Sequence, residues 1–192
     1  MKSAFALPLL ALSAASAIAA ECNVDGNLFQ LQAYQTNASG SRRTAQVQIT
    51  STGELGTDTL AHFSGAQEGI ETSTAVFYLN KANDRLIVLD SFSFLRASNA
   101  YIDNAKGGEL KFTFYNDTSR PDGYVWPVFD IATEEDGEWL SVDGKKDAFS
   151  FCPTDAESAL LTGSIAVGEA KEGCEELDGL KIYAVTSELS VE

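Results

Sequence analysis

Three cysteines, Cys22, Cys152 and Cys174, are the first residues of this sequence that could do chemistry. A catalytic thiol needs a neighbouring base or cation to lower its pKa, and a redox pair usually has close spacing. Cys152 and Cys174 are separated by residues 153–173, and no histidine lies near either of them in the sequence. In a secreted chain, such a pair favours a structural disulfide. We therefore predict a Cys152–Cys174 bond, and the sequence leaves the state of Cys22 open.

Nucleophilic and metal-assisted catalysis both lack the residues that they require. The chain has one histidine, His62, and no Gly-x-Ser-x-Gly nucleophile elbow. A typical zinc site needs several histidine or cysteine ligands at close spacing, and this sequence does not supply them. A lone histidine among apolar neighbours is more often structural. The sequence therefore predicts no catalytic triad, no metal and no cofactor.

Paired carboxylates offer a different route to catalysis, the acid chemistry of a glycoside hydrolase. The candidates fall into two clusters: Glu134, Glu135, Asp136 and Glu138, and then Glu175 and Glu176. The first cluster surrounds Gly137 at a predicted hairpin turn, where nothing would bury a carboxyl and raise its pKa. We expect a solvated turn there that does no chemistry, and an acidic glycoside hydrolase stays as an alternative. Segment 143–147 contains two lysines and lacks EF-hand spacing, so it predicts no calcium site.

Aromatic side chains could instead bind a sugar ring by stacking. The candidates are Tyr124, Trp126 and Trp139. Aromatic residues in alternating strands more often belong to a core. Strand alternation over segment 124–129 would bury Val128 with Trp126 on one face and Phe129 with Val125 on the other. We expect this segment to be mostly core, and carbohydrate binding is the main alternative.

The elements that would position these residues are strands joined by turns. Segments 27–36, 45–52, 108–117 and 180–187 alternate apolar and polar residues, and 73–91 has the pattern of a hairpin with its turn at Lys81 to Asp84. Further strands between 119 and 153 are separated by Pro-Asp-Gly, Glu-Asp-Gly and Asp-Gly-Lys-Lys turns. A capping-box spacing from Thr154 predicts one short helix.

A faint internal repeat narrows the fold class. In the first copy, Val-Phe-x-Leu at 76–79 is followed by a turn and then by Leu-x-Val. In the second copy, Val-Phe-x-Ile at 128–131 is also followed by a turn and then by Leu-x-Val. Recurring hairpins of this kind suit a β-trefoil or a β-sandwich. We predict an all-β fold with a single compact antiparallel domain. A β-trefoil-like arrangement is favoured, with a β-sandwich as the alternative.

The first residues and the net charge indicate where the protein works. Residues 1–20 have a lysine, a short apolar run and small residues at the end, as in a secretory signal peptide. Residues 21–192 would then form the single β-rich domain, and Asn37 and Asn116 begin sequons that could carry glycan. The apolar run is too short to span a membrane. A net charge of -15 repels nucleic acid and anionic membranes.

The end of the chain carries a series of short motifs: "LSVDG" at 140–144, "FSFCP" at 149–153, "GC" at 173–174 and "LKI" at 180–182. Together with the hairpin at 76–91, these segments resemble the PhiA family of fungal cell-wall proteins. The resemblance implies a secreted cell-wall protein that takes part in forming spore-bearing cells and conidia and in stress protection, without enzymatic activity. Its partners would be cell-wall polysaccharide or other wall components. A secreted carbohydrate-binding, lectin-like protein or effector is the alternative.

Overall fold

The fold is taken from a computed structural model of the chain. It describes residues 28–36, 40–50, 59–63, 75–89, 97–113, 119, 121–153, 163–169 and 172–185, with the backbone alone for 50 and 59–63. The expected signal peptide, Cys22, both sequons and the short helix expected from Thr154 lie outside the described residues. Within the described part, no helix is long and apolar enough to cross a membrane.

The described residues form strands that pair in antiparallel fashion throughout. This confirms the predicted all-β, antiparallel fold class. The strands are β1 (Phe29–Thr36), β2 (Arg42–Thr50), β3 (Thr59–Phe63), β4 (Val76–Asn80), β5 (Arg85–Leu89), β6 (Ala97–Tyr101), β7 (Gly107–Glu109), β8 (Lys111–Thr113), β9 (Phe129–Glu134), β10 (Gly137–Val142), β11 (Phe149–Pro153), β12 (Gly163–Gly168), β13 (Glu175–Glu176) and β14 (Gly179–Ala184).

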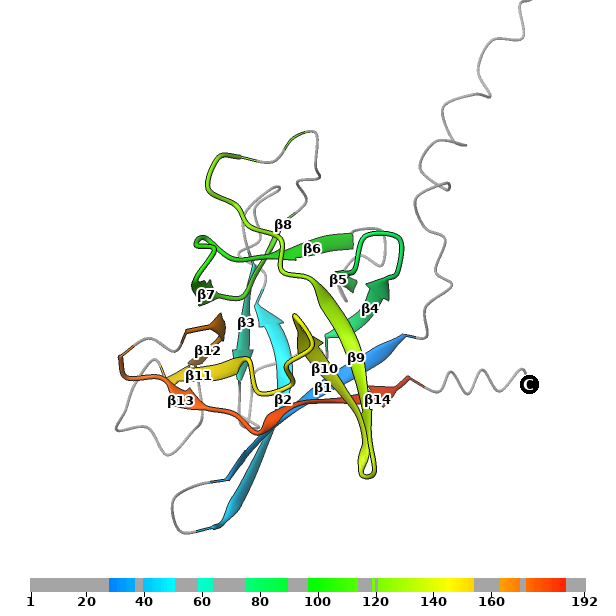
Figure 1. Cartoon of the computed structure of the whole chain (residues 1–192), viewed down its shortest axis with the longest axis vertical. Coiled ribbons are helices and arrows are strands. Elements are labelled where there is room, and N and C mark those ends of the chain that lie inside the picture. Colours follow the sequence, from blue (N-terminus) through cyan, green and yellow to red (C-terminus); the bar gives the residue numbers. More distant parts are fainter. Residues whose placement is uncertain are drawn as a thin grey trace, which may run out of the picture.

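Seven strands pair in a closed circuit. The order is β1, β2, β3, β8, β6, β5 and β4, and β4 pairs with β1 again through Phe29 and Phe77. Two further groups of strands pair with the circuit. In the first group, β14 pairs with β1, β10 with β14 and β9 with β10. In the second group, β12 pairs with β3 of the circuit and also with β7 and β11, and β13 pairs with β11. Figure 1 shows β1 and β14 side by side, although they are the first and last strands of the chain.

The core follows from the alternation of the strands. In β1, Phe29, Leu31 and Ala33 are buried, and the polar residues between them are partly exposed. Phe77 of β4 packs against Phe29 and Phe112, with ring centroids 6.3 and 6.0 Å apart. Each fully buried side chain of this size contributes about 1.5–3 kcal/mol through the hydrophobic effect. The circuit is therefore closed around a filled apolar interior.

The two segments of the internal repeat both form hairpins. Strands β4 and β5 pair Phe77 with Val88, and β9 and β10 pair Phe129 with Val142. The turn of the first hairpin lies at residues 81–84, as the sequence predicted. The backbone N–H of Phe129 donates to the Asp84 carbonyl at 2.8 Å, so the second hairpin begins at the turn of the first.

One predicted strand is divided in the structure. Segment 108–117 was expected to be continuous, but β7 ends before Leu110 and β8 begins after it. The N–H of Leu110 donates to the Ile165 carbonyl at 2.8 Å, and its side chain is buried. The chain changes partner at this residue, because β7 pairs with β12 and β8 pairs with β3 and β6.

Candidate functional site

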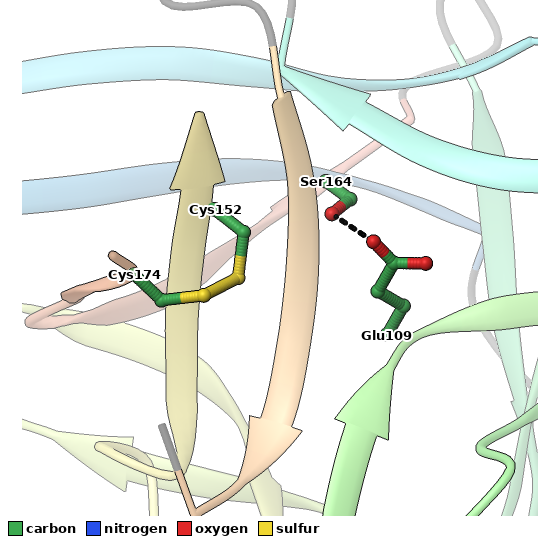
Figure 2. The surroundings of a disulfide bond; sticks show 4 residues. All are labelled: Glu109, Cys152, Ser164 and Cys174. Carbon is green, nitrogen blue, oxygen red and sulfur yellow. Dashed lines mark hydrogen bonds between the residues drawn. A yellow bond between two sulfur atoms is a disulfide. The ribbon is translucent and has the colours of Figure 1, made fainter. Parts of the chain in front are cut away.

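The disulfide joins β11 to the segment before β13. Cys152 and Cys174 are bonded, with their Cα atoms 4.2 Å apart, which confirms the predicted pair. Strand β13 has only two residues and pairs with Ser150 and Phe151 of β11. Figure 2 shows β12 between β11, which carries the disulfide, and β7, whose Glu109 accepts a hydrogen bond from Ser164 at 3.0 Å. The disulfide thus holds a strand too short to be held by its ladder alone.

Glu175, a candidate acid from the sequence, takes part in a polar network beside the disulfide. Its carboxylate accepts a hydrogen bond from Gln35 at 2.6 Å and pairs with Arg43 at 2.9 Å. Arg43 also donates to the side-chain amide oxygen Oε1 of Gln35. Charge-assisted contacts of this kind are shorter and stronger than hydrogen bonds between neutral groups. The arrangement links β1, β2 and β13, which suits a structural role for Glu175. The next residue, Glu176, is exposed.

The backbone of His62 is opposite Ser164 on β12 and Gln48 on β2. The side chain of His62 lies outside the described residues, so the predicted structural role stays a prediction. Among the described residues, no group of three or more histidine, cysteine, aspartate or glutamate side chains is placed to hold a metal ion.

The first acidic cluster lies at the exposed tip of the β9–β10 hairpin, as the sequence predicted. All four acids are exposed. Two of them nevertheless have partners, since Glu134 pairs with Lys146 and Asp136 accepts a hydrogen bond from the Trp139 indole N–H at 2.9 Å. The bond from Trp139, followed by the charge of Lys181, lowers the pKa of Asp136 below its ordinary value of 3.8. A general acid needs the opposite shift.

Trp139, a candidate for sugar stacking, is 2% exposed. The ammonium groups of Lys146 and Lys181 lie 5.1 and 5.3 Å from the centre of its ring, and Tyr34 meets it edge-on with centroids 5.5 Å apart. A Cβ at Gly179 would lie 2.9 Å from the indole, so this glycine allows the close approach. The ring is already covered, and a sugar could not stack on it without displacing these side chains.

Tyr34 and Tyr183 join β1 to β14 on the same surface. Their hydroxyl oxygens are 2.5 Å apart, and the Tyr34 hydroxyl donates to the side-chain amide oxygen Oε1 of Gln32 at 2.9 Å. Tyr183 must therefore be the donor of the bond to Tyr34, because the single proton of Tyr34 is already in use. This bond is the main cause that raises the pKa of Tyr183 from 10.0 to about 12.

We expect Tyr183 to ionise late, near pH 12, in a titration followed by the ultraviolet absorbance of tyrosinate. Replacing Tyr34 with phenylalanine removes the bond and should move this ionisation towards 10.0. Since the pKa is raised on folding, the stabilising effect is complete below pH 10.0 and is lost as the pH rises through about 12. A Tyr183→Phe variant identifies the signal. An unchanged titration in the Tyr34→Phe variant would contradict the assignment.

The other two stacking candidates lie elsewhere, in an aromatic group with Tyr101. Tyr124 stacks on Tyr101 with ring centroids 4.0 Å apart, and Trp126 meets Tyr101 edge-on at 6.2 Å. The guanidinium of Arg85 lies 4.7 Å from the centre of the Trp126 ring. Tyr101 is fully buried, whereas Tyr124 and Trp126 are half-buried. This group supports Trp126 at the protein surface.

The predicted burial of segment 124–129 is wrong at Val128, which is 50% exposed. Strand alternation was assumed across the whole segment, but β9 begins only at Phe129. Before it, Val125 makes an isolated bridge to Ile102, and the Val128 carbonyl accepts a bond from the N–H of Asp143 at 3.1 Å. Residues 126–128 therefore have no strand partner that would impose alternation. Phe129 itself is fully buried, as expected.

A groove of about 280 Å³ lies beside Trp126 and Val128. Three chain segments build it: residues 102–107, residues 125–128 and residues 142–148, with the end of β12 closing it. Its lining is largely apolar, and Lys106, Lys145 and Asp143 are the charged residues that line it. An apolar concave surface with an aromatic wall and a few polar groups is the usual form of a small-ligand site.

Comparison with known proteins gives no guide to this site, because no family model, no curated protein and no solved structure matches the chain. Its geometry therefore carries the functional argument. The groove contains one of the three stacking candidates from the sequence, Trp126, with Val128 beside it. Neither Lys106 nor Lys145 was predicted as a site residue, because Lys145 was noted only as part of the Asp-Gly-Lys-Lys turn and Lys106 stands in no recognisable motif.

Proposed function

We propose that this protein is secreted, associates with the cell wall and acts there by binding polysaccharide rather than by catalysis. The observation that carries the proposal is the groove with Trp126 and the exposed Val128. An aromatic ring and an aliphatic side chain at the surface offer a sugar ring an apolar face to rest on. The signal-peptide pattern of residues 1–20 and the disulfide support secretion.

The role in sporulation and stress protection is part of the same proposal and rests on the resemblance to the PhiA family. The finer fold assignment, β-trefoil-like or β-sandwich, also stays a prediction. Either fold assignment has to contain the closed circuit of seven paired strands.

An acidic glycoside hydrolase is the enzymatic alternative, and the carboxylates weigh against it. Asp136 has a lowered pKa, Glu134 pairs with Lys146 and Glu175 pairs with Arg43. The lowered pKa of Asp136 favours its ionised form, whereas the acid of a glycosidase must hold a proton. The other two carboxylates are engaged in ion pairs. Hydrolysis of a wall glucan by the purified protein would support this alternative.

The first experiment is fractionation of cells that express a tagged protein. We expect the protein in the wall fraction, from which purified wall polysaccharide in excess should release it. Recovery of the protein only from the medium, without binding to any wall polysaccharide, would contradict the proposal.

The groove is tested by replacing its exposed apolar residues. Trp126→Ala and Val128→Ser should each weaken polysaccharide binding, the first by about tenfold, which corresponds to about 1.4 kcal/mol. Val185→Ser is the matched control, because Val185 is 36% exposed and does not line the groove. Binding is measured by pull-down on insoluble polysaccharide and folding by circular dichroism. Equal binding by all three variants would show that the groove is not the binding site.

A further inference from the structure

The charge of the groove differs from that of the whole chain. The chain has a net charge of -15, yet the groove is lined by two lysines, Lys106 and Lys145, and by one acid, Asp143. The local balance is therefore one positive charge (two minus one). All three side chains are exposed. These three charges line the groove itself, so they are the ones that a bound ligand would contact and that salt would screen least.

Both lysines stand on turns with a fixed backbone. Lys145 follows a turn in which Asp143 and Gly144 have φ values of 50° and 75°, and Val142 and Lys145 exchange two backbone hydrogen bonds. Positive φ at both central residues is the geometry of a tight hairpin turn, for which Asp-Gly is a preferred pair. The turn therefore presents Lys145 from a backbone that is already ordered.

The turn that carries Lys106 is fixed in a similar way. The N–H of Lys106 donates to the Asn104 side-chain oxygen at 3.0 Å, and its carbonyl accepts a bond from Glu169 at 3.1 Å. Gly107 and Gly168 pack so closely that an added Cβ at Gly107 would lie 2.6 Å from the Val167 carbonyl oxygen. The loop is thereby held against the end of β12. Neither lysine makes an ion pair with a described residue.

We propose that the groove binds a carboxylate-bearing sugar unit of an acidic polysaccharide. Its ring would rest on Trp126 and Val128, and its carboxylate would pair with Lys106 or Lys145. This inference rests on the proposed function and adds the chemical class of the ligand. A volume of about 280 Å³ suits a single unit of a longer chain, since pockets for drug-sized ligands begin near ~300 Å³.

The test compares a short oligomer of uronic acid with its methyl ester, which has the same sugar rings without the charge. Binding to the full-length secreted protein is measured by calorimetry. We expect the acid to bind more tightly than the ester, by about two- to thirty-fold if both lysines contribute as exposed ion pairs do. The double variant Lys106→Gln and Lys145→Gln should lose this preference and keep its affinity for the ester.

Lys81→Gln is the control for the change in net charge, because Lys81 is exposed on the β4–β5 turn and does not line the groove. It should bind both oligomers as the wild type does. Equal binding of acid and ester by the wild type would overturn the inference and leave the proposed function standing. Binding of neither oligomer, combined with binding of a neutral wall glucan, would also overturn it. Binding of no sugar polymer at all would overturn both.

Discussion

Breaking the Cys152–Cys174 disulfide is expected to lower the free energy of unfolding by about 3 kcal/mol, the effect of closing a loop of this length in the unfolded chain. The bond closes a loop over a sequence separation of 22 and holds the two-residue strand β13 against β11. Its loss also removes a constraint next to Glu175, which pairs with Arg43 of β2. Thermal unfolding should move down by about 6–12 °C for a domain of this size.

The comparison uses the oxidised protein, the reduced protein and the double variant Cys152→Ala and Cys174→Ala. The reduced protein and the double variant should unfold at the same temperature, because each lacks the bond and keeps the rest of the chain. Peptide mapping without reduction should recover a Cys152–Cys174 pair. A peptide that links Cys22 to either residue, or equal stability of all three forms, would contradict the assignment.

Replacing Trp139 with alanine should cost about 3–5 kcal/mol, as expected for a large side chain removed from a packed site. Trp139 is 2% exposed and contacts Tyr34, Lys146, Lys181 and Asp136. The variant should unfold at much lower denaturant concentration. Trp139→Phe keeps a ring and loses the indole N–H bond to Asp136, so its loss should be near ~1 kcal/mol.

Trp126→Ala is the matched comparison, because it removes the only other tryptophan in the chain. Trp126 is half-buried, so its loss should destabilise the protein less while weakening polysaccharide binding more. The two variants thus separate a tryptophan that supports the fold from one that contacts the ligand. A stable Trp139→Ala protein that no longer binds polysaccharide would reverse these roles.

Local features of the fold could be predicted from the sequence, because each depends on neighbouring residues. Alternation in β1 identified its buried face, and Asp-Gly and Glu-Asp-Gly identified the hairpin turns. The disulfide was predicted from the spacing of two cysteines in a chain whose first residues resemble a signal peptide. The repeated hairpin was visible because Phe77 and Phe129 start equivalent pairs.

The candidate site could be predicted only in part, because it depends on which distant segments meet. Trp126 was a stacking candidate only under the alternative interpretation of a segment expected to be mostly core. The lysines that share its groove come from turns at residues 104–107 and 142–145. Trp139 looked equally suitable, and only the positions of Lys146 and Lys181 show that its ring is covered. Val128 was wrongly predicted to be buried because residues 126–128 have no strand partner that would impose alternation.

The pairing of β1 with β14 has a consequence for how the chain acquires its structure. The six pairs run from Phe29 with Ala184 to Tyr34 with Gly179, so they join residues near opposite ends of the sequence. Contacts this distant require a large loop to close first, and proteins rich in them fold in milliseconds to seconds. A chain made from its N-terminus has β1 available long before its partner exists. The sheet is therefore completed only after the chain has been synthesised as far as Ala184.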